Sequence, residues 1–395
     1  MNDNHFVPQY HFRLFMGGKR YIHLARRDGS CFAHGRRFVR IAPIKDQCAP
    51  HNFYGSERVE SWLGTLENRH SPVYRAVIDI AWGARTTTLS DEEDYHLREA
   101  ILLQRVRTPS HASVSASLYT QMVLYTYCDY LRTLSTTLER QATIEAIQRG
   151  KATLRNSQFL ALMTSLRNIE SWVMTISDLS LLILRNQTTV PFIIGDAPCV
   201  FSNHYMRDIR NSGVLGFTTP GLMAALPIDW RTQILFYDAT VYQPDYSTVG
   251  CIDIFRIGDV SLLNALQVHS AKENVYFSDE SSEEYLSDLL SAHRLLLQSH
   301  QSKFISHNPG EVLIDGVPST GEILHTFEPQ LPIVPNLSFI STSTLPSGVN
   351  PNRPRDPALL QQALQAVGIE DETSPIGIDE LVSWVEHDIH VSVDT

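Results

Sequence analysis

The hydrophobic period of this chain changes once, and the change divides the chain into a helical part and a strand-rich part. Between about residues 56 and 186, apolar residues recur at the three- or four-residue spacing of amphipathic helices. From Val190 onward, short apolar runs alternate with turn residues such as those at 195–198, a pattern typical of buried strands. Because helices come before strands instead of alternating with them, the sequence predicts an α+β fold.

The first 55 residues predict a basic antiparallel β-meander. Residues 11–16 alternate with a period of two, and the glycine-containing turns at 17–18 and 28–29 separate three strand candidates. Pro8 lacks the N–H that a central strand needs, so we expect residues 5–9 to form an extended lead-in whose polar groups face a cleft.

The rest of the chain predicts a helical middle and a second group of β-strands with flanking helices. Pro72 is expected to break the first helix, and the Ser-Asp-Glu-Glu stretch at 90–93 is a capping box that starts the next one. The expected helices are residues 56–83, 91–106, 110–148, 152–186, 259–272 and 280–303, and the expected strands are 222–228, 233–238 and 250–257.

These elements suggest one domain over residues 1–307, followed by an appendage. Within the domain, residues 1–55 form the meander, 56–188 the helical region and 189–307 the mixed strands and helices. Residues 308–395 are rich in Pro, Ser and Thr, and after Arg355 they contain no Lys or Arg but nine acidic residues. We expect an irregular acidic C-terminal appendage, with a short amphipathic helix near residues 378–385 that docks either on the body or on a protein partner.

Composition indicates a soluble protein without a zinc knuckle or a disulfide framework. The chain has 395 residues, and no apolar run approaches the roughly 18 residues needed to cross a bilayer. The N-terminus lacks the basic and apolar regions of a signal peptide, so the expected location is the cytoplasm. Five scattered cysteines without a C-x-x-C pair favour neither a disulfide framework nor a zinc knuckle.

The net charge of −11 conceals an uneven distribution. Residues 1–85 contain 13 Lys and Arg against 7 Asp and Glu, a net charge of +6, so the remaining 310 residues carry −17. A basic sheet beside an acidic body can attract a phosphate-bearing ligand such as a nucleotide or nucleic acid. An internal interface with the acidic half of the chain explains the same pattern, and the sequence leaves both interpretations open.

Several strong functional motifs are missing from the sequence. It contains no P-loop, no G-x-G-x-x-G, no H-E-x-x-H and no G-x-S-x-G. His293, His300 and His307 are seven residues apart, which on a helix separates them by about 10.5 Å, too far to share one ion. We interpret them as a polar helix stripe.

A set of scattered polar residues remains as a candidate site. A histidine, two carboxylates and an arginine could bind a divalent ion such as Mg²⁺ or Mn²⁺ and a phosphate. Each residue also has a structural explanation, such as a helix face for the glutamates and a loop hydrogen bond for Asp196. The candidates are His5, Gln9, Glu67 (or Glu60) and Asp196 for catalysis, Glu67 and Asp196 for the metal, and Arg13, Arg20 and Asn203 for the substrate phosphate.

Five sequence motifs give a family resemblance. The sequence HFVPQYHFRLF at 5–15 resembles the opening signature of the domain-of-unknown-function family 4238, a mainly bacterial group, although Phe12 replaces the usual leucine and His11 the usual aromatic residue. The other four motifs follow in the order expected for the family: NFYG at 52–55 with its spaced glutamates, QRVRTP at 104–109, GDAP at 195–198 and the LP pair at 226–227. At 195–198 the family usually has Ser-Asp-Asn-Pro.

The resemblance covers about residues 4–280. It implies no established activity, but it implies that five residues are motif positions: His5, Pro8, Gln9, Glu67 and Asp196.

Two functions are expected from these observations. The first is a hydrolase acting on a phosphate-containing substrate, as a metal-dependent nuclease or nucleotide hydrolase. The alternative is a non-catalytic recognition module that binds nucleic acid or an acidic protein partner through the basic N-terminal sheet. The sequence does not decide whether the protein is an enzyme.

Overall fold

The computed structural model describes most of the chain. The described residues are 5–17, 19–32, 37–51, 53–55, 57–133, 137–149, 151–209, 213–245, 250–278, 283–297, 303–307, 310–311, 313–314, 317–318, 323–346, 353–366, 383–384 and 387–391. None of the described helices is both long enough and apolar enough to cross a membrane.

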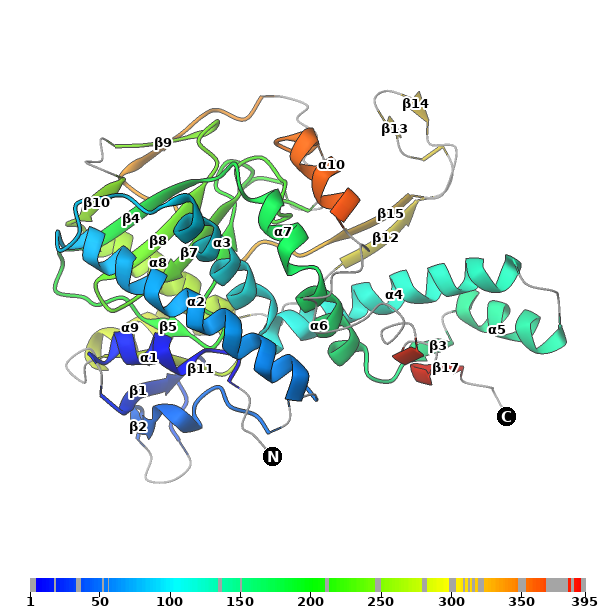
Figure 1. Ribbon diagram of the computed structural model, residues 1–395, viewed down its shortest axis with the longest axis horizontal. Helices are drawn as coiled ribbons and strands as arrows, with labels where there is room; N and C mark the ends of the chain where they lie inside the picture. The colour runs from blue at the N-terminus through cyan, green and yellow to red at the C-terminus, as the bar shows by residue number, and fades with distance from the viewer. Residues whose placement is uncertain are drawn as a thin grey trace.

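A five-stranded sheet lies at the centre of the body and is covered on both faces (Figure 1). Its strands are, in spatial order, β10 (Cys251–Ile254), β4 (Ser180–Asn186), β8 (Thr232–Tyr237), β7 (Met223–Pro227) and β6 (Val200–Ser202), and only the β10–β4 pair is parallel. In β7, Ala224 and Leu226 pack toward the helical layer, whereas Met223 and Ala225 pack toward the opposite face. Two covered faces explain why the strands are apolar throughout.

Helices form the layers on either side of this sheet. One face packs against α2 (Glu57–Ala81), α3 (Asp91–Val106), α6 (Ser157–Arg167) and α7 (Ile169–Thr175). The other face packs against α8 (Ile257–Ser270). The helical middle followed by strands confirms the predicted α+β class, and α3 begins with the predicted capping box, in which Ser90 accepts from the Glu93 N–H.

The N-terminal segment forms a second, antiparallel sheet together with two strands from the later part of the chain. Its order is β2 (Arg40–Pro43), β1 (Tyr21–Arg26), β11 (Asn274–Phe277) and β5 (Ile194–Gly195). The amphipathic helix α1 (Gln9–Phe15) covers it, with the Phe12 ring 4.7 Å from that of Tyr276. The first and last parts of the domain therefore share one core.

The prediction of a strand at residues 11–16 was wrong, because these residues belong to α1. In a stretch this short, alternation and helical spacing are hard to distinguish. The helix buries His11, Phe12 and Phe15 on one face, and Pro8 precedes it with φ −65°, a value already suited to the start of a helix. The expected meander thus retains only two of its three strands.

The predicted break at Pro72 was also wrong, since α2 continues through it. A proline inside a helix costs about 3 kcal/mol, because it removes one hydrogen bond and crowds the preceding turn. Here buried residues continue on both sides of Pro72, from Val59 and Leu66 to Tyr74 and Ala81. The burial of this stripe outweighs the local cost.

The single helix expected at residues 152–186 was wrong as well. This stretch forms β3 (Ala152–Leu154), α6, α7 and β4, and α6 ends at Arg167. The helix expected up to residue 303 ends at His293, followed by a short 3-10 helix, η3 (Arg294–Leu296). His307 lies on a strand and His300 lies outside the described residues, so the three histidines do not share one helix.

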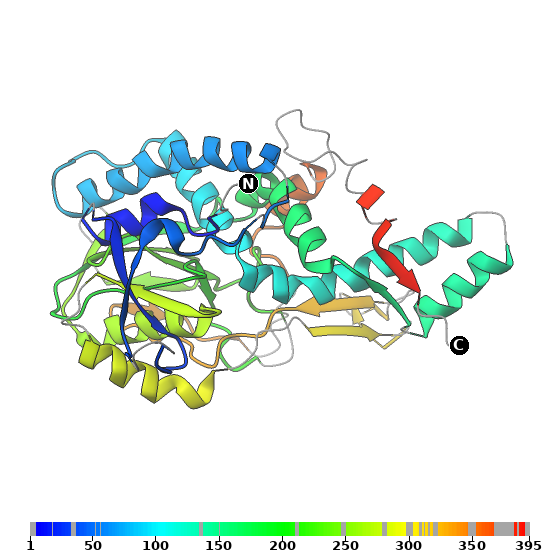
Figure 2. The same ribbon diagram turned by 90° about the horizontal axis from the view of Figure 1, so that it is seen from below.

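The remaining elements lie around this body. Figure 2 shows α4 and α5 extending away from the two sheets. The bounds are α4 (Pro109–Thr133), α5 (Leu138–Gln148), α9 (Glu283–His293), α10 (Pro357–Ala366), η1 (Ile44–Asp46), β9 (Tyr242–Pro244), β12 (Lys303–His307), β13 (Leu313–Ile314), β14 (Val317–Pro318), β15 (Ile323–Phe327), β16 (Ile340–Thr342) and β17 (Ile389–Val391).

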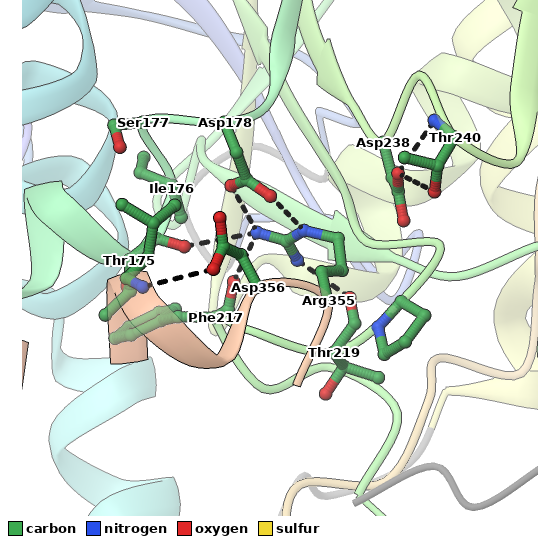
Figure 3. A network of polar contacts seen from close by, with 12 residues as sticks. Thr175, Ile176, Ser177, Asp178, Phe217, Thr219, Asp238, Thr240, Arg355 and Asp356 are labelled. Carbon is green, nitrogen blue, oxygen red and sulfur yellow. Dashed lines mark hydrogen bonds and ion pairs between the residues drawn. The ribbon is translucent and has the colours of Figure 1, made fainter. Parts of the chain in front are cut away.

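Parts of the expected C-terminal appendage are built into the body. Leu337 and Phe339 are buried in the core beside α8, and β16 pairs with β9. Further along, the Arg355 guanidinium is 4% exposed and donates to both carboxylate oxygens of Asp178, each at 2.8 Å. Figure 3 shows it surrounded also by the carbonyls of Thr175, Phe217 and Thr219, to which it donates. This contact holds α10 beside α7.

Replacing Arg355 should therefore destabilise the protein. We expect Arg355→Ala to lower the free energy of unfolding by roughly 2 to 3 kcal/mol, because five hydrogen bonds around one charged group are lost together. Urea unfolding followed by circular dichroism measures the effect, with Arg353→Ala as the control at an exposed arginine two residues away. Equal stability of the two variants would contradict this anchoring role.

Candidate functional site

A cleft of about 810 Å³ lies between α1 and α2, and four of the residues singled out from the sequence line it. We call it the α1–α2 cleft. The four predicted residues are His5, Gln9, Arg13 and Glu67, and the other lining residues are Tyr10, Leu14, Gly17, Gly64, Asn68, Ser71 and Arg75. Residues from two separate motifs of the sequence therefore meet at one surface.

On the α1 side, three of these residues follow one another at intervals of four. The ring of His5 donates from Nε2 to the carbonyl oxygen of Lys45 at 2.9 Å, because a carbonyl can only accept. Gln9 lies next to this ring, and its Oε1 accepts from Arg13 Nη2 at 2.7 Å. The lead-in and the first helix thus present a row of polar side chains to the cleft.

On the α2 side, Glu67, Ser71 and Arg75 are also four residues apart and so lie on one helix face. Ser71 and Arg75 were not among the residues predicted from the sequence, and Arg75 lies beyond the break expected at Pro72. The helical spacing of 67, 71 and 75 was the signal that would have found them.

Glu67 also balances a buried charge. Its Oε1 accepts from Arg107 Nη1 at 2.8 Å, and the Arg107 side chain is fully buried. Burial opposes the charged form of Arg107, but Glu67 keeps the pKa of its guanidinium above the ordinary value. Arg107 Nε donates to the carbonyl of Phe6 at 2.9 Å, which ties the lead-in to the end of α3.

The charge left over in the cleft is positive. Among the described residues that line the cleft, Glu67 is the only carboxylate, and Arg107 already neutralises it. In the part of the chain that the structure describes, Arg13 and Arg75 form no salt bridge, and both are exposed. Two exposed guanidinium groups beside neutral donors such as Asn68 and Ser71 suit an anionic ligand, above all a phosphate.

His11 fixes the wall of the cleft instead of lining it. The side chain is fully buried, and its Nε2 donates to the Pro227 carbonyl at 2.6 Å. Its ring lies 5.1 Å from that of Tyr74. Burial lowers the pKa of His11 from 6.5 to about 4, so the ring is neutral at pH 7 and links α1 to the end of β7.

Asp196 lies in a different environment from Glu67 and is not among the residues that line the cleft. It is 5% exposed, and its carboxylate accepts from the backbone N–H groups of Lys272, Glu273 and Asn274 at 2.6, 2.8 and 3.0 Å. Burial raises its pKa, while these hydrogen bonds act in the opposite direction. The carboxylate therefore holds the turn that leads into β11.

Asn203 and Arg20 also lie away from the cleft lining. Asn203 is fully buried, and its Nδ2 donates to the carbonyls of Val214 and Pro220, both at 2.8 Å. Arg20 is exposed just before β1. Glu60, the alternative to Glu67, does not line the cleft either.

The described residues contain no group of three His, Cys, Asp or Glu side chains that could hold a metal ion. A Mg²⁺ or Mn²⁺ ion in the cleft would therefore depend on Glu67, on water and on phosphate oxygens of the substrate, which is a common arrangement for Mg²⁺. Asp196 is a weaker candidate ligand, because three backbone hydrogen bonds already occupy its oxygens.

Comparison with known protein families gives one match. A family model described as "Protein of unknown function (DUF4238)" matches residues 3–281. The chain belongs to this family. The DUF4238 match includes both walls of the α1–α2 cleft and ends a few residues after β11. Comparison with curated proteins gives no match, and comparison with solved structures gives none either. Membership of DUF4238 brings no activity and assigns no site residue.

The buried His11 leads to a pH prediction. Between pH 6.5 and about 4 the unfolded chain binds a proton at this ring that the folded protein does not, so stability should fall as the pH falls through this window. The loss amounts to roughly 1 kcal/mol per pH unit. His11→Gln keeps a donor near Nε2 but does not titrate, so its unfolding free energy should depend less on pH between 6.5 and 4. An unchanged pH dependence in urea titrations would argue against a neutral buried His11.

Proposed function

We propose that the protein is a hydrolase that binds the phosphate group of its substrate in the α1–α2 cleft. The observation that supports this most is that His5, Gln9, Arg13 and Glu67 line one cleft whose remaining charge is positive. The proposed substrates are nucleic acid or a nucleotide, since these carry phosphates and are attracted by a basic N-terminal region.

Each residue has a distinct proposed role. Arg13 and Arg75 contact phosphate oxygens, for which the planar guanidinium is suited. His5 acts as the general base: because its Nε2 donates to Lys45, Nδ1 is the nitrogen that can accept a proton from the attacking water. Glu67, whose Oε1 already accepts from Arg107, would help to hold a divalent ion through its other carboxylate oxygen.

Asp196 and Asn203 have structural roles in this proposal and do not contact the substrate. Asp196 keeps β11 in place beneath α1, and Asn203 holds the loop between β6 and β7. Arg20, which is exposed just before β1, provides an additional contact for a long substrate.

Hydrolysis and binding should respond to different substitutions. With labelled RNA, DNA and nucleotides in Mg²⁺ or Mn²⁺, we expect His5→Ala to lower the rate by about 10² to 10⁴ while affinity changes little. Arg13→Ala should weaken binding about tenfold or more, because it removes a hydrogen bond between two charged groups. Arg149→Ala, at an exposed arginine directly after α5, is the matched control.

Two results would reject the hydrolase proposal. One is the lack of any hydrolysed product from all substrates at saturating protein and metal. The other is hydrolysis that continues at the wild-type rate in the His5→Ala protein. Melting temperatures of each variant establish that a lost rate does not reflect a lost fold.

The basic sheet supports a second candidate function, a recognition module. A cleft of about 730 Å³ is formed on β1, β2 and β11 and by the chain around η3. Its charged lining residues are Arg26, Arg27, Arg40, Lys272 and Arg294 against Asp28, Asp46 and Glu273. This surplus of cations favours an anionic partner, nucleic acid or an acidic protein. A protein partner for the acidic tail stays a prediction, because much of the tail lies outside the described residues.

Salt dependence tests the recognition function. If Arg26 and Arg40 each contact one phosphate of a DNA duplex, the double substitution to alanine should lower the slope of log Kd against log salt by about two. Arg149→Ala again serves as the control. A slope that the double substitution leaves unchanged would exclude this sheet as the nucleic-acid surface.

A further inference from the structure

A second cleft, of about 690 Å³, lies on the other side of the end of α1. We call it the Trp230 cleft. It is lined on one side by Met16, Gly17 and Lys19, which follow from α1 toward β1, and on the other by Trp230 and Arg231 at the turn between β7 and β8. None of the roles proposed above uses it.

Trp230 provides an exposed aromatic surface in this cleft. The side chain is 42% exposed, an unusual position for the largest apolar side chain. The guanidinium carbon of Arg231 lies over its ring, 5.3 Å from the centroid, and also over the ring of Trp82 at 4.7 Å. Aromatic and guanidinium planes stacked in this way resemble the surfaces on which unpaired bases stack.

The turn that carries Trp230 is held in place before any ligand binds. Asp229 Oδ1 accepts from the backbone N–H groups of Arg231 and Thr232, both at 2.7 Å. Trp82 Nε1 donates to Thr232 Oγ1 at 3.0 Å, and the Trp230 carbonyl accepts from the Phe192 N–H at 2.9 Å. A ligand that stacks here therefore spends little free energy on ordering the protein.

The two clefts are neighbours across one wall. Gly17 lines both, and α1 contributes Gln9 and Arg13 to the α1–α2 cleft and Phe15 to the Trp230 cleft. The His11–Pro227 hydrogen bond fixes α1 against the strand that leads to the Trp230 turn. The side chains that α1 presents to the α1–α2 cleft are thus held in a fixed position relative to the turn that carries Trp230.

Cations also continue into the second cleft. Lys19 and Arg231 line it, and its described lining residues include no carboxylate. The remaining polar lining comes from uncharged or weakly basic groups such as Thr188 and His23. A ligand that crosses from one cleft to the other therefore needs negative charge at both ends and a flat ring in the second cleft.

We infer that the substrate is single-stranded nucleic acid. Its backbone binds in the α1–α2 cleft through Arg13 and Arg75, crosses the chain at Gly17, and places an unpaired base on Trp230. A duplex is disfavoured, because its bases are already stacked and paired. This inference rests on the proposed function, since it uses the same phosphate site and adds the substrate class.

Binding without divalent metal tests the inference without interference from hydrolysis. The probes are fluorescein-labelled ten-nucleotide strands of DNA and RNA, the corresponding duplexes, and inorganic pyrophosphate as a competitor that lacks a base. The variants are Trp230→Ala, Trp230→Phe and Arg13→Ala, with Phe255→Ala as the control at another exposed aromatic residue, 75% exposed and outside both clefts.

Single strands are expected to bind more tightly than duplexes. Trp230→Ala should weaken single-strand binding about 5- to 100-fold, the range for the loss of one stacked base. The same variant should leave pyrophosphate affinity unchanged, Trp230→Phe should restore most of the loss, and Phe255→Ala should have no effect. Arg13→Ala should weaken the binding of the DNA single strand, the RNA single strand and pyrophosphate.

The outcomes separate this inference from the function on which it rests. If Arg13→Ala weakens pyrophosphate and strand binding but Trp230→Ala changes neither, the phosphate site stands and the single-strand inference is overturned. A duplex that binds as tightly as the single strand also overturns the inference. If the wild-type protein binds neither pyrophosphate nor strands, the proposed function falls, and the inference falls with it.

Discussion

The buried guanidinium of Arg107 is the interaction on which the site depends. A charged group without exposure to water is tolerated only when it is paired and hydrogen-bonded, and Arg107 finds its partners in Glu67 and the Phe6 carbonyl. Because one group contacts the N-terminal lead-in, α2 and the end of α3 at once, it sets the distance between the two walls of the α1–α2 cleft. It also neutralises the negative charge of Glu67, so Arg13 and Arg75 make the net charge of the α1–α2 cleft positive.

Helix α1 connects the α1–α2 cleft to both sheets. It is only seven residues long, so its own hydrogen bonds cannot hold it in water. Its position comes from the contact of Phe12 with Tyr276 below and from the His11–Pro227 hydrogen bond at its side. These contacts join it to both sheets, so one short helix forms a wall of the α1–α2 cleft and of the Trp230 cleft. The proposed path of a nucleic acid strand follows from that shared wall.

Much of the fold was predictable, because most of its elements depend on local patterns. The capping box fixed the start of α3, and the apolar runs identified β7, β8 and β10. The failures came where long-range packing overrode a local signal. Residues 11–16 alternate like a strand, but burial of Phe12 and Phe15 against the N-terminal sheet selects a helix. Pro72 should end α2, but its buried stripe continues to Ala81. That second failure also hid Arg75 from the candidate site.

The sequence by itself determined the fold class and the family. It also named His5, Gln9 and Arg13 as candidates, although it predicted an extended segment and a strand where the structure has the lead-in and α1. Only the tertiary structure decided which motifs meet. It brought His5 and Gln9 to the same cleft as Glu67. It also placed Asp196, which follows β5, against the turn before β11, where three backbone N–H groups donate to its carboxylate. The physical reason is that a buried charge is stable only beside its partner. Which partner is within reach depends on how segments distant in sequence pack, and no local pattern records that.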